Sequence, residues 1–165
     1  MEQQHLDVLL KVCSRLRDTP VEWALTGSLG MALQGVELPV HDIDLQTDEQ
    51  GAYAIERCFS EYVVKPVTCV ESERIRSHLG ALEMDGIKVE IMGAVAKRLD
   101  HGSWEAPVQV TRHRQWIEVR GVRVPVLSLE YEVEAYRKMG RIEKAEMLRS
   151  WLAQRRESGC PRGER

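Results

Sequence analysis

The sequence has few aromatic residues and no long hydrophobic run. Only 5% of its 165 residues are aromatic, and a single one is phenylalanine. The longest segment without a charged residue, 23–36, contains three glycines and is too short to span a bilayer. Charged residues near the N-terminus, including Glu2, Asp7 and Lys11, are not typical of a secretory signal. We therefore expect a cytoplasmic protein that does not cross a membrane.

The sequence also lacks an excess of positive charge. It contains 23 lysines and arginines against 26 aspartates and glutamates, which gives a formal net charge of -3. Binding along an extended nucleic acid or on an anionic membrane surface depends on positive charge, so no such surface is expected. Any site for a polyanion must therefore be local.

The cysteines are few and widely separated. No CxxC pair occurs, and no histidine stands at the spacing of a zinc finger, which argues against a structural zinc site. The chain is also unlike the short, cysteine-dense sequences of disulfide-stabilised secreted proteins. We expect free thiols at all four positions, namely Cys13, Cys58, Cys69 and Cys160.

The length and the composition are those of one soluble domain. Hydrophobic residues make up 43% of the chain and charged residues 30%, and 165 residues suffice for a substantial core without disulfides. We expect one domain over residues 1–155 and a flexible tail over 156–165, where Gly159, Pro161 and Gly163 disfavour regular structure.

Hydrophobic periodicity and turn residues predict a mixture of helices and strands, hence an α/β (α+β) fold. Residues 93–114 are expected to be irregular, with helical content near 94–99. Asp85-Gly86 is a strong hairpin signal. The expected helices are 3–17, 29–34, 48–61, a helix starting at Ser128, and 141–154; the expected strands are 21–26, 40–46, 63–70, 78–84, 87–92, 115–120 and 122–126.

Three carboxylates stand on predicted strands with apolar neighbours. Asp42 and Asp44 alternate with Ile43 and Leu45, so they share one strand face about 7 Å apart. Glu90 has the same parity on another strand, so it could join them if the two strands are neighbours. Mg²⁺ prefers carboxylate, water and phosphate oxygens, and it would relieve the repulsion between the carboxylates.

A Gly-Ser pair follows the first predicted strand. Gly27 permits an unusual backbone conformation and close approach of a ligand, and Ser28 is expected to cap the next helix. A helix N-terminus presents free N–H groups to anions. The pair is therefore a candidate cradle for the phosphates of a nucleotide.

The ordered set of Thr26-Gly27-Ser28, Asp42-Ile43-Asp44-Leu45 and Val89-Glu90-Ile91 resembles the nucleotidyltransferase superfamily typified by DNA polymerase β, in particular its small stand-alone members. The motifs cover about residues 20–92. The resemblance implies a mixed β-sheet flanked by helices, two Mg²⁺ ions on the three acidic residues, and an NTP donor, most simply ATP. The segment from residue 126 is similar to the C-terminal part of several small members, which implies a C-terminal helical pair over about 128–155.

These observations lead to a hypothesis of Mg²⁺-dependent nucleotidyl transfer. Asp42 and Asp44 would bind both metal ions, and Glu90 would complete one metal site and help to deprotonate the acceptor hydroxyl. Gly27 and Ser28 would hold the leaving pyrophosphate. An aminoglycoside-like drug, a protein hydroxyl and an RNA end all remain possible acceptors. The alternatives are a nucleotide-binding regulatory module of the toxin and antitoxin type, and a metal-dependent phosphohydrolase.

One basic segment stands outside these motifs. It runs from Arg112 to Arg123 and contains Trp116. It is interpreted either as the solvated face of a hairpin or as a surface for the acceptor or the triphosphate.

Overall fold

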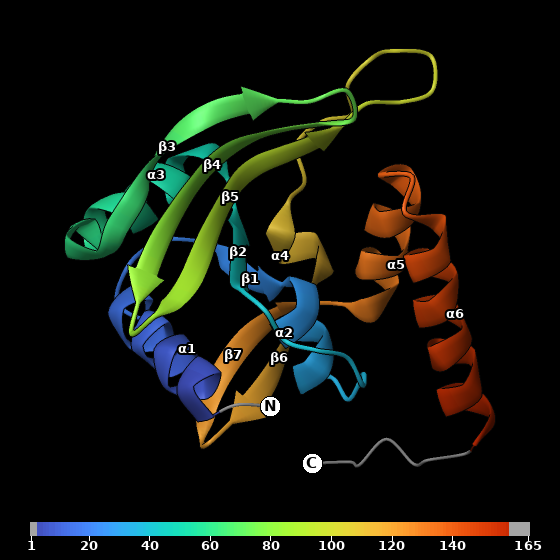
Figure 1. Cartoon of the computed structure of the whole chain (residues 1–165), viewed down its shortest axis with the longest axis horizontal. Coiled ribbons are helices and arrows are strands. Elements are labelled where there is room, and N and C mark those ends of the chain that lie inside the picture. Colours follow the sequence, from blue (N-terminus) through green and yellow to red (C-terminus); the bar gives the residue numbers. More distant parts are fainter. Residues whose placement is uncertain (1–2, 159–165) are drawn as a thin grey trace.

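The computed structural model describes residues 3–158, and its centre is a seven-stranded sheet in the order β3-β4-β5-β2-β1-β7-β6 (Figure 1). β1 runs antiparallel to β2 and parallel to β7, while β2 runs parallel to β5. The expected mixed sheet is therefore confirmed. The strands are β1 (Trp23–Thr26), β2 (Ile43–Thr47), β3 (Val63–Glu71), β4 (Ile75–Met84), β5 (Ile87–Lys97), β6 (Arg114–Val119) and β7 (Val122–Leu127).

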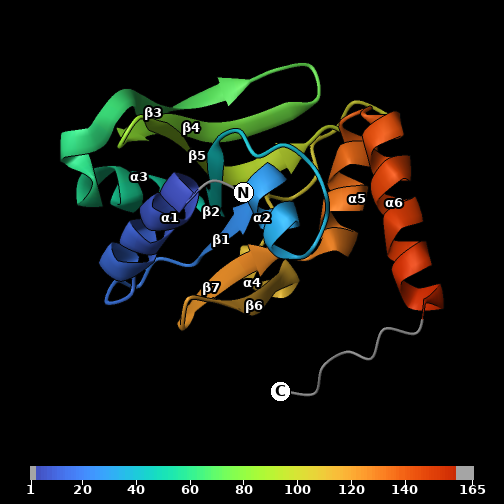
Figure 2. The ribbon, with the colours of Figure 1, turned by 60° about the horizontal axis from the view of Figure 1, so that its bottom comes forward.

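Helices flank this sheet, as expected. The last two helices pack against each other as a pair beside the sheet, which agrees with the predicted C-terminal helical pair (Figures 1 and 2). The helices are α1 (Gln3–Leu16), α2 (Gly27–Leu33), α3 (Glu49–Cys58), the 3₁₀ turn η1 (Ser60–Tyr62), α4 (Val110–His113), α5 (Leu129–Lys138) and α6 (Ile142–Glu157).

The main core lies on one face of the sheet, against α1 and α3. Ile43 and Leu45 of β2 are fully buried in this core, together with Val8 and Leu9 of α1 and Ile55 of α3. Because side chains alternate along a strand, the residue between Ile43 and Leu45 points to the opposite face. Burial of the apolar face thus fixes the direction of the polar face.

Two local predictions about secondary structure are wrong. Residues 94–97 continue β5, because β4 supplies backbone partners as far as Lys97; Ala94 adopts a positive φ of 51° within the strand. Helix α2 begins at Gly27, so Thr26 rather than Ser28 is its N-cap residue. By contrast, Asp48 caps α3, as expected, by accepting a hydrogen bond from the N–H of Gly51.

The C-terminal helix is longer than the sequence predicts. α6 extends to Glu157, so residues 156 and 157, expected in the tail, are helical, and 159–165 lie outside the described residues. Cys13, Cys58 and Cys69 are free thiols, while Cys160 lies outside the described part. Between residues 3 and 158, no helix is both long and apolar enough to cross a membrane.

Candidate active site

The middle of the sheet brings two of the predicted acidic residues together. Asp44 of β2 lies opposite Glu90 of β5, and on its other side it lies opposite Thr26 of β1. Burial raises the pKa of Asp44 to about 7, and the negative charges of Glu90 and Asp42 and a hydrogen bond with Glu90 act in the same direction. The site without a cation therefore favours a proton on this carboxyl group.

Gly27 packs directly against that carboxylate. It has a φ of 74°, and a Cβ atom at this position would overlap with Oδ2 of Asp44. Any other residue would therefore be strained and would displace the Asp44 side chain. The bend after β1 and the side chain of Asp44 on β2 are therefore in direct contact, and the position of one depends on the other.

Ser28 ties the bend to the segment that precedes β2. Its Oγ accepts a hydrogen bond from the backbone N–H of His41 at 3.2 Å. Because Oγ of Ser28 acts as an acceptor here, its hydroxyl hydrogen remains available to donate a hydrogen bond to a ligand. Ser28 therefore connects the bend at Gly27 with His41, the residue that precedes Asp42.

Asp42 lies just before β2, two residues before Asp44, and its negative charge contributes to the raised pKa of Asp44. Oδ2 of Asp42 is 4.0 Å from Nζ of Lys88, and 43% of the Asp42 side chain is exposed. In the described range 3–158, no group of three or more His, Cys, Asp or Glu side chains is arranged to hold a metal ion. Asp44 and Glu90 thus converge, whereas Asp42 contacts a lysine.

A family comparison covers most of the chain. The model of the aminoglycoside-2''-adenylyltransferase family matches residues 8–150. The chain belongs to this family. It is therefore an enzyme of the nucleotidyltransferase superfamily, as the sequence motifs predict.

One solved structure supports the same assignment, and a second supports the fold. TM1012 of Thermotoga maritima, described as a candidate nucleotidyltransferase, is 55% identical, with 93% of this chain and 96% of that chain covered and a TM-score of 0.83. The lincosamide adenylyltransferase LnuA, solved with lincomycin, is 14% identical over 90% of this chain and 98% of its own, with a TM-score of 0.52, and supports the fold alone. No curated protein matches the sequence.

The family member carries a fourth carboxylate that sequence reasoning missed. Glu132 of α5 is only 4% exposed, and its Oε1 accepts hydrogen bonds from Oγ1 of Thr26 and from the N–H of Gly27, the latter at 3.4 Å. Burial raises its pKa to about 7, and these two hydrogen bonds oppose the shift. In the sequence Glu132 is an ordinary acidic residue near a helix N-terminus, and no spacing rule links it to a residue 106 positions away.

A layer of polar side chains continues along the same face of the sheet. Gln46 lies two residues beyond Asp44, and its Nε2 donates to the hydroxyl of Tyr131 at 3.3 Å. The Nζ of Lys97, which is 4% exposed, donates to the same hydroxyl at 3.3 Å. Burial lowers the pKa of Lys97 and raises that of Tyr131 to about 12, so the phenol keeps its proton. This layer fixes α5, and with it Glu132, against β2 and β5.

Proposed function

We propose that this enzyme transfers AMP from ATP to a hydroxyl group of a small acceptor molecule, with release of pyrophosphate and with Mg²⁺ as cofactor. The observation that carries the proposal is the packing of Asp44 between Glu90 and Gly27. A carboxylate pair beside the start of a helix can hold a divalent cation next to the phosphates of a nucleotide.

The side chains at the site fit a hard divalent cation. All candidate ligands are carboxylate oxygens. Burial, and after it the negative charges of Glu90 and Asp42, raise the pKa of Asp44, and a bound cation would offset both effects. We infer that Asp44 and Glu90 would hold Mg²⁺, and that Asp42 would complete a site for two ions after leaving Lys88. When bound, Mg²⁺ polarises the α-phosphate and neutralises the charge that develops during the displacement.

The remaining residues act on the nucleotide and the acceptor. The acceptor oxygen forms a bond to the α-phosphorus, and the bond from that phosphorus to the pyrophosphate oxygen breaks. The carboxylate of Glu90 accepts the proton of the attacking hydroxyl. The backbone N–H of Ser28 and the free hydroxyl hydrogen of Ser28 stabilise the negative charge on the departing pyrophosphate.

Glu132 serves as a positioning residue in this scheme. It touches neither nucleotide nor acceptor, but it holds both the Thr26 hydroxyl and the Gly27 N–H. These contacts fix the bend against Asp44. Burial of this carboxylate is costly, and its hydrogen bonds to Thr26 and Gly27 and the charge of Lys97 offset part of that cost.

The family assignment supports a small antibiotic as the acceptor to test first, because the matching family is named for adenylyl transfer to the 2'' position of aminoglycosides. Among the three acceptors that the motifs leave open, this favours the drug-like hydroxyl over a protein or an RNA end.

The proposal is tested by incubating the enzyme and MgCl₂ with a panel of aminoglycosides and with ATP labelled on either the α- or the γ-phosphate. We expect the α-label in the modified antibiotic and the γ-label in pyrophosphate. Asp44→Asn should abolish both products, whereas Asp18→Asn, which alters an exposed carboxylate in the turn after α1, should not. Release of labelled inorganic phosphate alone would indicate hydrolysis and overturn the proposal.

A further inference from the structure

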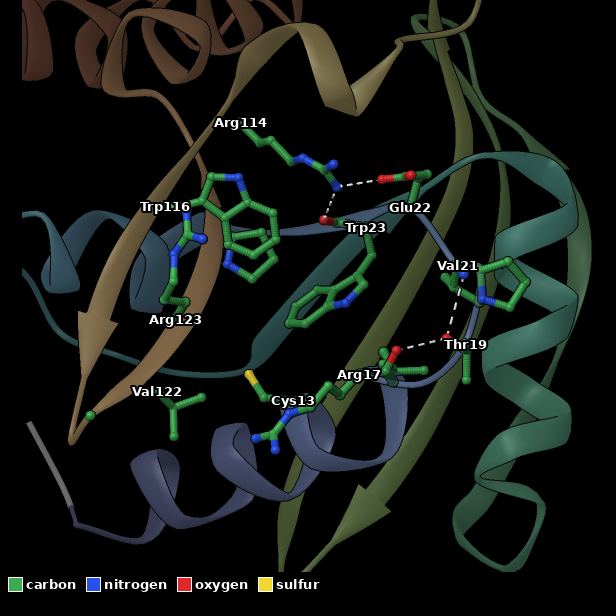
Figure 3. Close-up of a pocket in the computed structure, with 14 residues that line it drawn as sticks. Cys13, Arg17, Thr19, Val21, Glu22, Trp23, Arg114, Trp116, Val122 and Arg123 are labelled. Carbon is green, nitrogen blue, oxygen red and sulfur yellow. Dashed lines mark hydrogen bonds and ion pairs between the residues drawn. The ribbon is translucent and has the colours of Figure 1, made fainter.

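A second cavity lies far from the carboxylates. Its volume is about 620 Å³, and it is formed by the end of α1, the start of β1 and the β6–β7 hairpin (Figure 3). Trp23, which lines it, begins β1, whereas Thr26, opposite Asp44, ends that strand about 10 Å away. Trp23 also belongs to the core on the α1 face, so the sheet separates this cavity from the acidic site.

The rim of the cavity is positively charged. Three arginines line it, and a single acidic residue, Glu22, stands among them. Arg114 is held in place, since Nη1 lies 2.7 Å from Oε2 of Glu22 and 3.5 Å from the carbonyl oxygen of Trp23. This concentration of positive charge occurs in a chain whose net charge is -3.

Two of these arginines have no acidic partner. Neither Arg17 nor Arg123 forms an ion pair with any residue in the range 3–158, whereas Arg120 on the same hairpin pairs with Asp7. The guanidinium carbon of Arg123 lies 5.0 Å from the ring centre of Trp116, and that of Arg114 lies at the same distance. Stacking therefore fixes the guanidinium of Arg123 at the cavity while leaving its N–H groups available to an anion.

The walls between the arginines are apolar and aromatic. Trp116 is 48% exposed, whereas Trp23, which also lines the cavity (Figure 3), is only 6% exposed. Cys13 also lines the cavity, but burial raises its pKa to about 11, so it is no thiolate nucleophile at neutral pH. The surface is thus suited to reversible binding of a flat ring with an attached anion.

We propose that this cavity binds a flat aromatic ring that carries a phosphate, the chemistry of a nucleotide, either free or as a unit of a single-stranded nucleic acid. The arginines bind the phosphate, and the exposed indole of Trp116 contacts the base above the buried Trp23. A volume of about 620 Å³ lies in the usual range for small-molecule sites. The proposal stands apart from the transfer reaction, because no residue of the acidic site takes part.

The four tryptophans allow a direct test by NMR. The ¹⁵N-labelled full chain is titrated with AMP in the presence of EDTA, and the indole N–H signals are followed. We expect the signals of Trp23 and Trp116 to shift, while those of Trp104 and Trp151, which do not line the cavity, stay in place. Shifts confined to Trp104 and Trp151, or no shifts at millimolar AMP, would overturn the proposal.

Matched arginine variants test the contacts with the phosphate. Arg17→Gln and Arg123→Gln should each weaken AMP binding about tenfold, whereas Arg112→Gln, an exposed residue of α4 outside the cavity, should leave it unchanged. Equal affinity in all three variants would contradict the site.

Two further ligands test whether the aromatic ring is needed for binding, and whether the bound nucleotide is free or part of a nucleic acid. Inorganic phosphate should bind at least about tenfold more weakly than AMP, and equal affinity would refute the role of the ring. A short single-stranded oligonucleotide that causes the same tryptophan shifts at lower concentration than AMP would support the proposal and identify nucleic acid as the source. Tighter binding of AMP would support it with the free nucleotide as the source.

Discussion

The two ends of β1 lie beside groups of opposite charge. At its C-terminal end, Asp44 and Glu132 are carboxyl groups that form no ion pair within the described part of the chain, and both have a pKa raised to about 7. At its N-terminal end, Arg17 and Arg123 line a cavity and are likewise without an acidic partner among residues 3–158. Elsewhere, exposed charges such as Arg120 and Asp7 pair with each other.

The difference shows which charges are available to a ligand. In a surface ion pair each charge is neutralised by its partner, and the pair contributes little to the free energy of unfolding. Buried carboxylates without an ion-pair partner are costly, so they mark a position where a cation from outside would complete the structure. Arg17 and Arg123 are exposed, and their N–H groups are open to an anion. The acidic end of β1 is suited to metal and nucleotide, and the basic end to an anion.

The largest effect is expected from Asp44→Asn. Loss of this carboxylate should reduce nucleotidyl transfer at least about 10³-fold, because it removes a proposed metal ligand beside Glu90. The same change removes buried charge, so the free energy of unfolding in EDTA should stay equal or rise at pH 8. Transfer rates and urea denaturation measure the two effects, and a variant that keeps half of the wild-type rate would contradict the assigned role.

Gly27→Ala should be nearly as harmful to transfer, for a different reason. The positive φ of Gly27 and the overlap of a Cβ with Asp44 predict a loss of about 100-fold in rate and about 1–3 kcal/mol in stability. Gly121→Ala is the control, because Gly121 has a similar φ and an open neighbourhood. It should lose stability alone, and an equal loss of rate would refute the specific contact with Asp44.

Glu132 variants should have an intermediate effect. Glu132→Ala removes the acceptor for Thr26 and Gly27, so kcat should fall about 10–30-fold. Glu132→Gln keeps a carbonyl oxygen for these donors and should recover most of the rate, with KM for ATP close to that of the wild type. If Gln and Ala variants with similar melting temperatures lose the same activity, Glu132 does not act through these hydrogen bonds.

A smaller effect is expected in the pH dependence of stability without metal. The pKa values of Asp44 and Glu132 are raised from 3.8 and 4.5 to about 7, so the folded state binds more protons than the unfolded state between about pH 4 and 7. Stability from these groups is therefore fully present below pH 4 and is lost as the pH rises through 7.

Urea denaturation in EDTA measures this loss. We expect a decrease of about 1–3 kcal/mol between pH 5 and pH 8 and a shallower decrease in Asp44→Asn. Identical pH profiles of the two proteins would show that Asp44 does not contribute.

The smallest effect is expected at the other end of β1. Arg123→Gln should change the free energy of unfolding by about 0.5 kcal/mol or less, because its contact with Trp116 is a partly exposed cation–π interaction. Transfer should proceed at the wild-type rate, as the sheet separates this residue from the carboxylates. A tenfold loss of transfer would show that the two ends of β1 are not independent.

The sequence was sufficient for the fold class because burial patterns and turns are local. The alternation of Ile43 and Leu45 with Asp42 and Asp44 predicts which face of β2 is apolar, and the hairpin at Asp85-Gly86 forms as expected. The prediction of helical content at 94–97 is wrong because these residues form a strand through pairing with β4. Local sequence preferences carry no information about that pairing.

Part of the candidate site depends on contacts that the sequence does not encode locally. The proximity of Asp44 and Glu90 follows from the parallel pairing of β2 with β5, which parity along a strand allows but does not require. Glu132 reaches Thr26 only because α5 packs over β1, and the contact of Asp42 with Lys88 depends on side-chain directions. Tertiary packing therefore decides which of the acidic residues meet.

A crystal structure of the enzyme with Mg²⁺ and a non-transferable ATP analogue tests the central claim most directly. The account predicts a metal ion about 2.1 Å from carboxylate oxygens of Asp44 and Glu90, with the β- and γ-phosphates at the Gly27-Ser28 bend. An analogue bound with its phosphates away from this bend, or metal ligands that include neither Asp44 nor Glu90, would contradict it.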